Sequence, residues 1–135
     1  QYDQNGEPRL CVHLTQRSCD VALGVPYNIA GYSFLLHLFA HLSNMKVGTF
    51  GHTLVDAHIY TKKADGSMKE YDHVPGLIEQ TKRKMRPLPE LKIDSNIRTL
   101  EDVMDLLDKD TEIIMSKFQL KNYNSEPFIP FRVAV

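Results

Sequence analysis

The chain has few cysteines and no long apolar run, and each shortage excludes a class of protein. Its 135 residues include only two cysteines, Cys11 and Cys19, too few for a disulfide scaffold. Two cysteines fit a reducing compartment. No apolar stretch approaches the length of a membrane span, and no signal peptide is visible. We therefore expect a cytoplasmic protein with no membrane partner.

An excess of charge of either sign is also missing. Lys and Arg number 16 against 17 Asp and Glu, which leaves a formal net charge of −1. No global field then attracts nucleic acid or a membrane surface, so partners must be inferred from local sites. The basic run at residues 82–86 has no interleaved aromatic residues. A solvated face is therefore a better interpretation of this run than a nucleic-acid contact.

The order of patterns along the chain predicts a mixed α/β fold. No internal repeat, low-complexity block or domain boundary interrupts it, and the length suits one domain. Apolar residues alternate with period two in some segments and follow helical spacing in others. We predict strands at 10–15, 50–60, 91–93 and 113–120, helices at 28–43 and 99–107, an exposed insertion at 61–85 and a proline-punctuated tail at 123–135.

The segment 28–43 has the clearest helical spacing. Its wide apolar stripe predicts a helix that is buried on most sides. Asn28 stands at the start, a natural cap position, and Asn44 stands near the end. His37 and His41 lie one turn apart, a spacing that can bind a metal ion. Because no third ligand is nearby, we interpret them as packing or interface histidines and expect no metal.

The most informative string is QRSCD at residues 16–20, followed by LGVPYN at 23–28. Arg17 offers a planar fork that matches phosphate oxygens, and Ser18 adds a hydroxyl donor beside it. Asn28 carries a donor and an acceptor, so it can pair with a base edge that offers the opposite pair. Each residue alone has an ordinary explanation, a solvated turn for the Arg-Ser pair and a helix cap for Asn28. Together they predict a nucleotide held at its phosphate and its base.

With these strings the chain resembles the C-terminal half of the thymidylate synthase family. The resemblance rests on QRSCD, LGVPYNIA at 23–30, HTL at 52–54, DAHIY at 56–60 and RPLP at 86–89, and it extends to the final VAV. It implies an α/β fold of the α+β type, with a large mixed sheet and a long buried helix packed on it. The chain 1–135 would be the C-terminal part of one such domain, without the N-terminal part of the fold.

The resemblance implies one-carbon transfer from 5,10-methylenetetrahydrofolate to carbon 5 of dUMP by a homodimer. Arg17 and Ser18 would hold the 5′-phosphate, and Asn28 would pair with the uracil ring NH and 4-oxo group. His58 and Tyr60 would bind the sugar hydroxyl, and strand alternation independently places them on one face with Asp56.

The folate side of the site is implied in the same way. Asp20, Leu23, Gly24 and Tyr27 would lie near the pterin, with Asp20 also close to the nucleotide and supporting catalysis. The carboxylate of Val135 would help to close the site once both ligands are bound.

Two products are compatible with the resemblance. Relatives that use cytidylate carry aspartate at the position of Asn28, so the amide favours dUMP. Departures at Tyr27, Gly31, Val55 and residues 62–63, where the family has Asn-His, leave open a phage-type hydroxymethylase. That enzyme lets water, in place of a folate hydride, capture the exocyclic methylene. We favour methylation, which makes dTMP, over 5-hydroxymethyl-dUMP.

The nucleophile of the family is not among these residues. The family's cysteine stands in a Pro-Cys-His string upstream of Gln1, and neither Cys11 nor Cys19 takes its place. We expect the chain to be a fragment that is inactive alone. A non-catalytic nucleotide-binding or interaction module therefore stays open as the alternative from another class.

Overall fold

The computed structural model describes residues 1–133, and the prediction for Val135 lies outside them. The chain divides into two compact units. The first unit comprises residues 1–13, 32–51 and 87–124, and the second comprises 14–31, 52–86 and 125–135. About 34% of the chain is helical and 26% is strand, so the predicted mixed α/β class is confirmed. None of the helices within 1–133 is long and apolar enough to cross a membrane.

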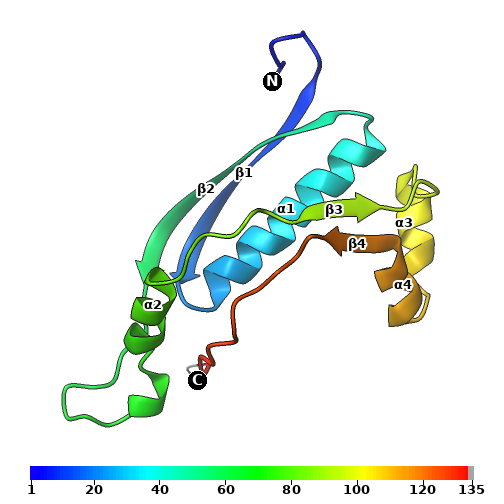
Figure 1. The fold of residues 1–135 in the computed structure, drawn as a ribbon. Helices are drawn as coiled ribbons and strands as arrows, with labels where there is room; N and C mark the ends of the chain where they lie inside the picture. Colours follow the sequence, from blue (N-terminus) through cyan, green and yellow to red (C-terminus); the bar gives the residue numbers. More distant parts are fainter. Residues whose placement is uncertain (134–135) are drawn as a thin grey trace. The chain divides into compact units, whose positions relative to one another are not determined.

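A strand–helix–strand motif forms the longest stretch of regular structure (Figure 1). It consists of β1 (Arg9–Asp20), α1 (Gly24–Leu42) and β2 (Lys46–His58). Lys46 N donates to Pro8 O at 3.1 Å where both strands begin, and Val21 N donates to His58 O at 3.0 Å where both end. The two strands therefore run parallel, and the helix supplies the long crossover that parallel neighbours need.

The start of α1 corrects one prediction. The helix begins at Gly24, so Asn28 lies in its second turn and is not the N-cap. Asp20 shapes the turn that leads into the helix, because its Oδ1 accepts from Ala22 N at 3.1 Å and from Leu23 N at 3.4 Å, both before the first helical residue. Pro26 is tolerated in the first turn, where backbone N–H groups have no helical partner in any case.

The end of α1 follows the predicted Asn44 signal. Asn44 is left-handed, with φ of 51°. Its N–H reaches His41 O at 3.2 Å, and Met45 N reaches Ala40 O at 2.9 Å. This pair of bonds is a Schellman motif with asparagine in the left-handed position.

The apolar stripe of α1 is buried only in part, which corrects the expectation of a helix covered on most sides. Leu36, Leu38 and Ala40 are buried. Other large apolar side chains of the helix remain exposed in this chain: Ile29, Tyr32, Leu35 and Phe39. Too few elements pack around the helix within residues 1–133 to cover both of its sides.

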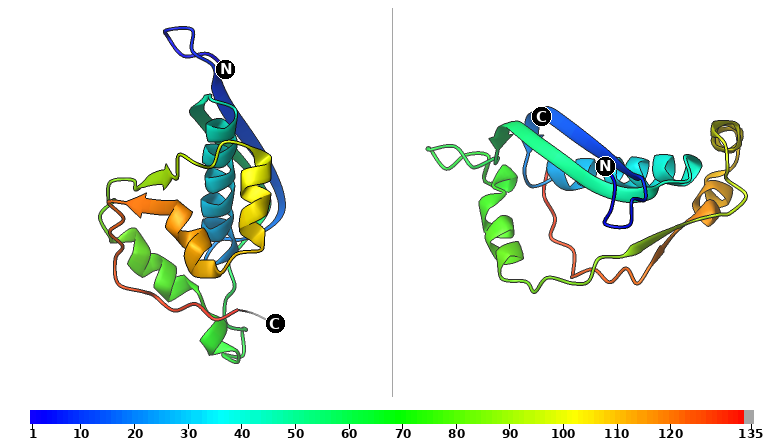
Figure 2. Two further views of the ribbon diagram at one scale, coloured as in Figure 1. Left: turned by 90° about the vertical axis from the view of Figure 1, so that its right-hand side faces the viewer. Right: turned by 90° about the horizontal axis from the view of Figure 1, so that it is seen from above.

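The remainder of the first unit is built on a short antiparallel pair, β3 (Glu90–Ile93) and β4 (Phe118–Lys121). Figure 2 shows the two arrows side by side. Leu91 stands opposite Leu120, and Ile93 stands opposite Phe118. The ring of Phe118 meets Phe34 of α1 edge-on, with centroids 5.1 Å apart. Within 1–133 the strands thus form two two-stranded sheets.

Two short helices connect β3 to β4, namely α3 (Leu100–Leu107) and α4 (Thr111–Lys117). The predicted strand at 113–120 is wrong over most of its length, because α4 occupies residues 111–117. Two β-branched residues in succession, Ile113 and Ile114, suggested a strand. Their N–H groups instead bond to Asp110 O at 2.9 and 3.1 Å and start a helix.

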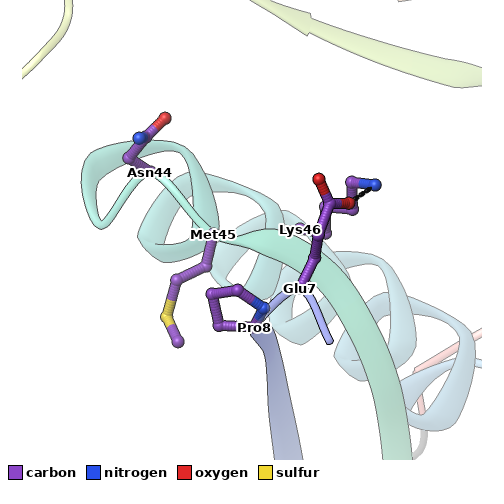
Figure 3. Close-up of a pocket in the computed structure, with 5 residues that line it drawn as sticks. All are labelled: Glu7, Pro8, Asn44, Met45 and Lys46. Atoms are coloured by element: carbon purple, nitrogen blue, oxygen red, sulfur yellow. Dashed lines mark ion pairs between the residues drawn. The ribbon is translucent and has the colours of Figure 1, made fainter. Parts of the chain in front are cut away.

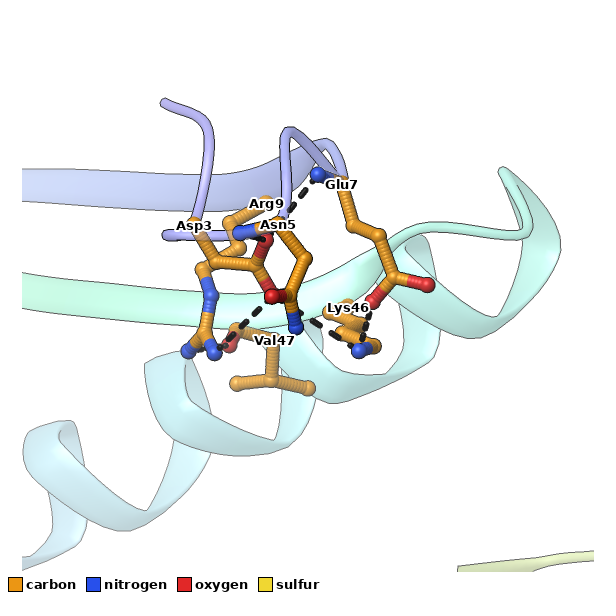
Figure 4. A network of polar contacts seen from close by, with 6 residues as sticks. All are labelled: Asp3, Asn5, Glu7, Arg9, Lys46 and Val47. Carbon is orange, nitrogen blue, oxygen red and sulfur yellow. Dashed lines mark hydrogen bonds and ion pairs between the residues drawn. The ribbon is translucent and has the colours of Figure 1, made fainter.

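A network of polar groups fixes the N-terminal turn of the first unit (Figure 4). Asp3 Oδ1 accepts from Asn5 N at 2.9 Å and from Glu7 N at 3.0 Å. Its other oxygen lies 3.6 Å from both Arg9 Nη2 and Lys46 Nζ. Lys46 also pairs with Glu7, as the close-up of the neighbouring pocket shows (Figure 3). One carboxylate thus ties the turn to the start of β2.

The second unit continues after β2 through a loop, η1 (Lys69–Tyr71) and α2 (Val74–Thr81). Residues 61–72 leave the strand and return where His73 N donates to Tyr60 O at 3.0 Å. Most side chains from 61 to 85 are exposed, and His73 within this segment is buried. Whether 61–85 is an insertion stays a prediction.

The capping box of α3 generates a prediction about acid stability. Thr99 and Asp102 cap each other, and Asp102 Oδ2 accepts from the backbone N–H groups of Arg98 and Thr99, each at 2.8 Å. These hydrogen bonds, the one from Arg98 first, lower the pKa of Asp102 below its ordinary 3.8. A lowered pKa stabilises the fold above the ordinary value and is lost as pH falls through the lowered one.

We therefore expect Asp102→Asn to destabilise the chain above pH 3.8, with a difference from wild type that shrinks at lower pH. Urea midpoints measured from about pH 2 to 7 check this. Asp105→Asn, on an exposed position of the same helix, is the matched control. A constant difference across the whole range would contradict the assignment.

Candidate functional site

The predicted site residues gather at one edge of the second unit, where β1 and β2 both end. The bond from Val21 N to His58 O places the two strand ends next to each other. Arg17, Ser18 and Asp20 lie among the last four residues of β1, and His58 is the last residue of β2. In parallel sheets the carboxyl ends of strands, beside the N-terminus of the following helix, are the usual place for ligands and for phosphate in particular.

The side chain of Gln16 makes hydrogen bonds to three other residues at this edge. Its Nε2 donates to Ser18 O and to Asn28 Oδ1, both at 2.9 Å. Its Oε1 lies 2.9 Å from His52 Nε2, and because an amide oxygen only accepts, His52 must carry the proton on Nε2. One side chain thus joins the end of β1, the second turn of α1 and β2.

Gln16 also sets the orientation of Asn28. Because Asn28 Oδ1 receives the hydrogen bond from Gln16, the amide nitrogen of Asn28 must point to the other side. Oδ1 keeps a second lone pair. Asn28 can therefore offer a donor and an acceptor together to a ligand edge with the opposite pair.

Arg17 and Ser18 are both exposed, as a phosphate-binding pair requires before ligand arrives. The carbonyl of Ser18 is held by Gln16, which fixes the backbone that carries the hydroxyl. A guanidinium fork and a hydroxyl at a strand end can bind an anion through charge-assisted hydrogen bonds. Convergence of Arg17 and Asn28 on one ligand stays a prediction.

Asp20 forms the corner between β1 and α1. Both of its bonds to backbone N–H groups end on Oδ1, so Oδ2 can accept from a ligand. Leu23 is half-buried, whereas Tyr27 is 78% exposed. A side chain added at Gly24 would meet Asp20 and Asn28 only at 3.5 and 3.7 Å, which is ordinary contact. Gly24 is therefore not required by packing within this chain.

His58 and Tyr60 lie together as predicted from strand alternation. Their rings meet edge-on, with centroids 5.3 Å apart. His58 Nδ1 donates to Asp56 O at 3.2 Å and lies 3.8 Å from Asp56 Oδ2. These contacts orient the imidazole so that Nε2 is the ring atom available to a ligand.

Cys19 and His41 are both held by hydrogen bonds to backbone carbonyl groups. Cys19 is fully buried, and its Sγ donates to Gln16 O at 3.2 Å. Buried in this way, it is not placed to attack a ligand. His41 Nε2 donates to Ile97 O at 2.7 Å, which agrees with a packing role. Within 1–133 no three His, Cys, Asp or Glu side chains are grouped as metal ligands.

Sequence reasoning gave no role to Gln16, His52 or His73. Gln16 was visible only as the first letter of QRSCD, and its partners lie 12 and 36 residues away. His73 follows an aspartate and precedes Val74-Pro75, a helix-start signal within the segment taken as an excursion. That proline was the one local sign that the chain turns inward at this point.

Comparison with known proteins shows the family to which the chain belongs. The family model described as "Thymidylate synthase" matches residues 1–135. Thymidylate synthase from Saccharomyces cerevisiae is 37% identical over 131 residues, which cover 97% of this chain and 36% of the yeast protein. The proteins of that name from saimiriine herpesvirus 2 and Homo sapiens are each 39% identical and cover 94% and 93% of this chain. The chain belongs to the thymidylate synthase family, as the resemblance predicted.

The chain spans about a third of the length of these curated relatives, with 36%, 36% and 34% of the yeast, viral and human proteins covered. What the whole protein catalyses and binds is therefore addressed as a proposal.

Gln16→Glu tests whether the hydrogen bonds of Gln16 stabilise this edge. A carboxylate cannot donate, so both bonds from Nε2 are lost and two acceptors are left facing a third. We expect the free energy of unfolding to fall by about 1–3 kcal/mol, measured in urea. Gln4→Glu, an exposed position in the N-terminal turn, is the control and should change little. Equal urea midpoints for Gln16→Glu and Gln4→Glu would refute this stabilising role of Gln16.

Proposed function

We propose that the protein carrying this chain is a thymidylate synthase, transferring a one-carbon unit from 5,10-methylenetetrahydrofolate to carbon 5 of dUMP. Family membership over all 135 residues supports the reaction class. The observation that carries the substrate choice is the bond from Gln16 Nε2 to Asn28 Oδ1, because it orients the amide for a uracil edge.

In this proposal the nucleotide lies along the edge where β1 and β2 end. Arg17 and Ser18 take the phosphate, and the helix N-terminus nearby favours its negative charge. His58 and Tyr60 take the sugar hydroxyl, with the His58 ring held by Asp56. Asn28 pairs with the ring NH and the 4-oxo group of uracil. In this arrangement the phosphate meets a cation and a hydroxyl donor, and the uracil edge meets an amide.

Binding the base in this way also assists the reaction. Carbon 5 of uracil is a weak nucleophile, and addition of a thiolate at carbon 6 turns the ring into an enolate with charge on the 4-oxo group. The amide N–H of Asn28, held in place before reaction, stabilises that charge. Because Cys19 is fully buried, we assign the thiolate to a cysteine outside this chain.

The corner at Asp20 fits the folate. The pterin of a folate presents N–H donors, and Asp20 Oδ2 is the acceptor that the backbone bonds leave for them. Leu23, Gly24 and Tyr27 would lie around the ring, with Tyr27 exposed and able to stack. When bound, the folate supplies the one-carbon unit and, for methylation, a hydride. Closure by Val135 stays part of this proposal, as do a homodimer and a cytoplasmic location.

The hydroxymethylase alternative rests on departures from the family pattern, of which Val55 is 63% exposed and Tyr27 is 78% exposed. The relatives named above are all thymidylate synthases, and we therefore prefer methylation. The full-length protein given dUMP and methylenetetrahydrofolate should release dTMP, and 5-hydroxymethyl-dUMP as the product would replace the synthase with the hydroxymethylase.

Asn28→Asp tests the base contact. An ionised carboxylate only accepts, so it cannot donate to the 4-oxo group of uracil but can accept from the 4-amino group of cytosine, and preference should move from dUMP toward dCMP. We expect the ratio of kcat/KM for the two nucleotides to change by roughly 100-fold or more in the full-length protein. Asn124→Asp, at an exposed position, should leave the ratio unchanged. Unaltered selectivity in Asn28→Asp would remove Asn28 from the base site.

A further inference from the structure

His73 is the most buried polar side chain described, with 1% of its surface exposed. It stands at the N-cap of α2, and its backbone N–H returns to Tyr60 O. Its ring lies between two aromatic rings, Tyr60 at 5.8 Å and Phe131 at 5.1 Å, both edge-on. A histidine enclosed in this way is held in one orientation.

The two ring nitrogens of His73 face different parts of the second unit. Nε2 lies 2.8 Å from Arg132 O, and because a carbonyl only accepts, Nε2 must carry the proton. Nδ1 lies 4.0 Å from Asp20 Oδ1 and is buried without a hydrogen-bond partner among the described residues. A buried polar atom without a partner is costly, so simple packing would favour an apolar residue here.

The tail before Arg132 is attached to the same stretch of chain at two further points. Arg83 Nη1 donates to Pro127 O at 2.8 Å. Arg86 donates to Glu126 Oε1 through Nε at 2.8 Å and through Nη2 at 2.5 Å. The tail therefore lies along residues 73–86, with His73 as its last anchor.

Gly76 gives the tail room to approach α2. A Cβ atom there would stand 2.6 Å from Phe131 Cε1, closer than real contacts allow, and 3.0 Å from Ile129 Cγ2, a tight contact. Any larger residue at 76 would force the Phe131 side chain to shift. The contact at Gly76 and the hydrogen bond from His73 thus hold the same part of the tail, residues 129–132, against the start of α2.

We propose that His73 is a positioning residue that sets the C-terminal tail relative to Asp20. One buried ring binds the tail through Arg132 O and stands beside the carboxylate through Nδ1. The inference rests on the proposed function in one respect: Asp20 and the tail then belong to the folate side of the site. Loss of the anchor should weaken folate use and leave nucleotide binding in place.

Amide hydrogen exchange of the tail in the full-length protein tests the anchor without reference to catalysis. In His73→Leu, which fills the space but cannot donate, exchange at residues 129–133 should quicken by roughly tenfold. His73→Gln, whose amide can reach Arg132 O, should restore most of the protection, and His73→Asn should not. Unchanged exchange in His73→Leu would overturn the proposal.

Kinetics separates a positioning role from a merely structural one. The KM for methylenetetrahydrofolate should rise by roughly five- to tenfold in His73→Leu, with the KM for dUMP within about twofold of wild type and His73→Gln close to normal. Arg83→Gln removes only the hydrogen bond to Pro127 O. It should quicken exchange near residues 126–128, and it should raise the folate KM less than His73→Leu does. Equal rises in both KM values would count against positioning.

The experiments also distinguish failure of the proposed function from failure of the His73 anchor. If wild type shows exchange protection but no activity, the proposed function fails and the anchor stands. If His73→Leu does not fold, Gly76→Ala keeps the His73 ring and forces the Phe131 side chain off α2, and it should raise tail exchange and the folate KM together. Gly76→Ala with wild-type exchange would refute the attachment of the tail to α2.

Discussion

The backbone bond between Val21 and His58 is the constraint on which the rest of the site depends. It aligns the ends of two parallel strands, so residues from both strands and from the first turns of α1 meet at one edge. Side-chain bonds then refine that edge, with Gln16 orienting Asn28 and Asp56 orienting His58. The order is typical of α/β proteins, where topology gathers the functional groups and local polar contacts aim them.

In the proposed site, specificity would come from groups that do not touch the ligand. Gln16, bonded to His52, orients the amide of Asn28, and His73 binds the tail through Arg132 O. A donor or acceptor that is already oriented costs little to reorganise when the substrate binds. His73 is buried and Gln16, Asn28 and His52 are half-buried, so these polar groups lie at this edge in spite of their desolvation cost.

Local signals gave the fold class, the family and the chain positions of the site, and they failed where tertiary contacts decide. Asn44 was readable as a helix end because its left-handed backbone is a local property. Asn28 was misread as a cap because the helix begins four residues earlier, at Gly24, after a turn that the Asp20 carboxylate holds. The two isoleucines of α4 suggested a strand until the Asp110 carbonyl started a helix. The roles of Gln16 and His73 could not be read, since their partners lie between 12 and 59 residues away.

The loop at residues 61–72 departs and rejoins through the single bond between His73 N and Tyr60 O. A segment closed in this way can lengthen or shorten over evolutionary time while Tyr60 and His73 keep their places. Its tip, a tight turn in which Asp65 accepts from Ser67, has its own hydrogen bonds and needs nothing from the site. An epitope or fluorophore grafted at the exposed Ala64, and not at Gly66, whose φ of +79° would be strained by a side chain, would therefore report on the protein without disturbing this edge.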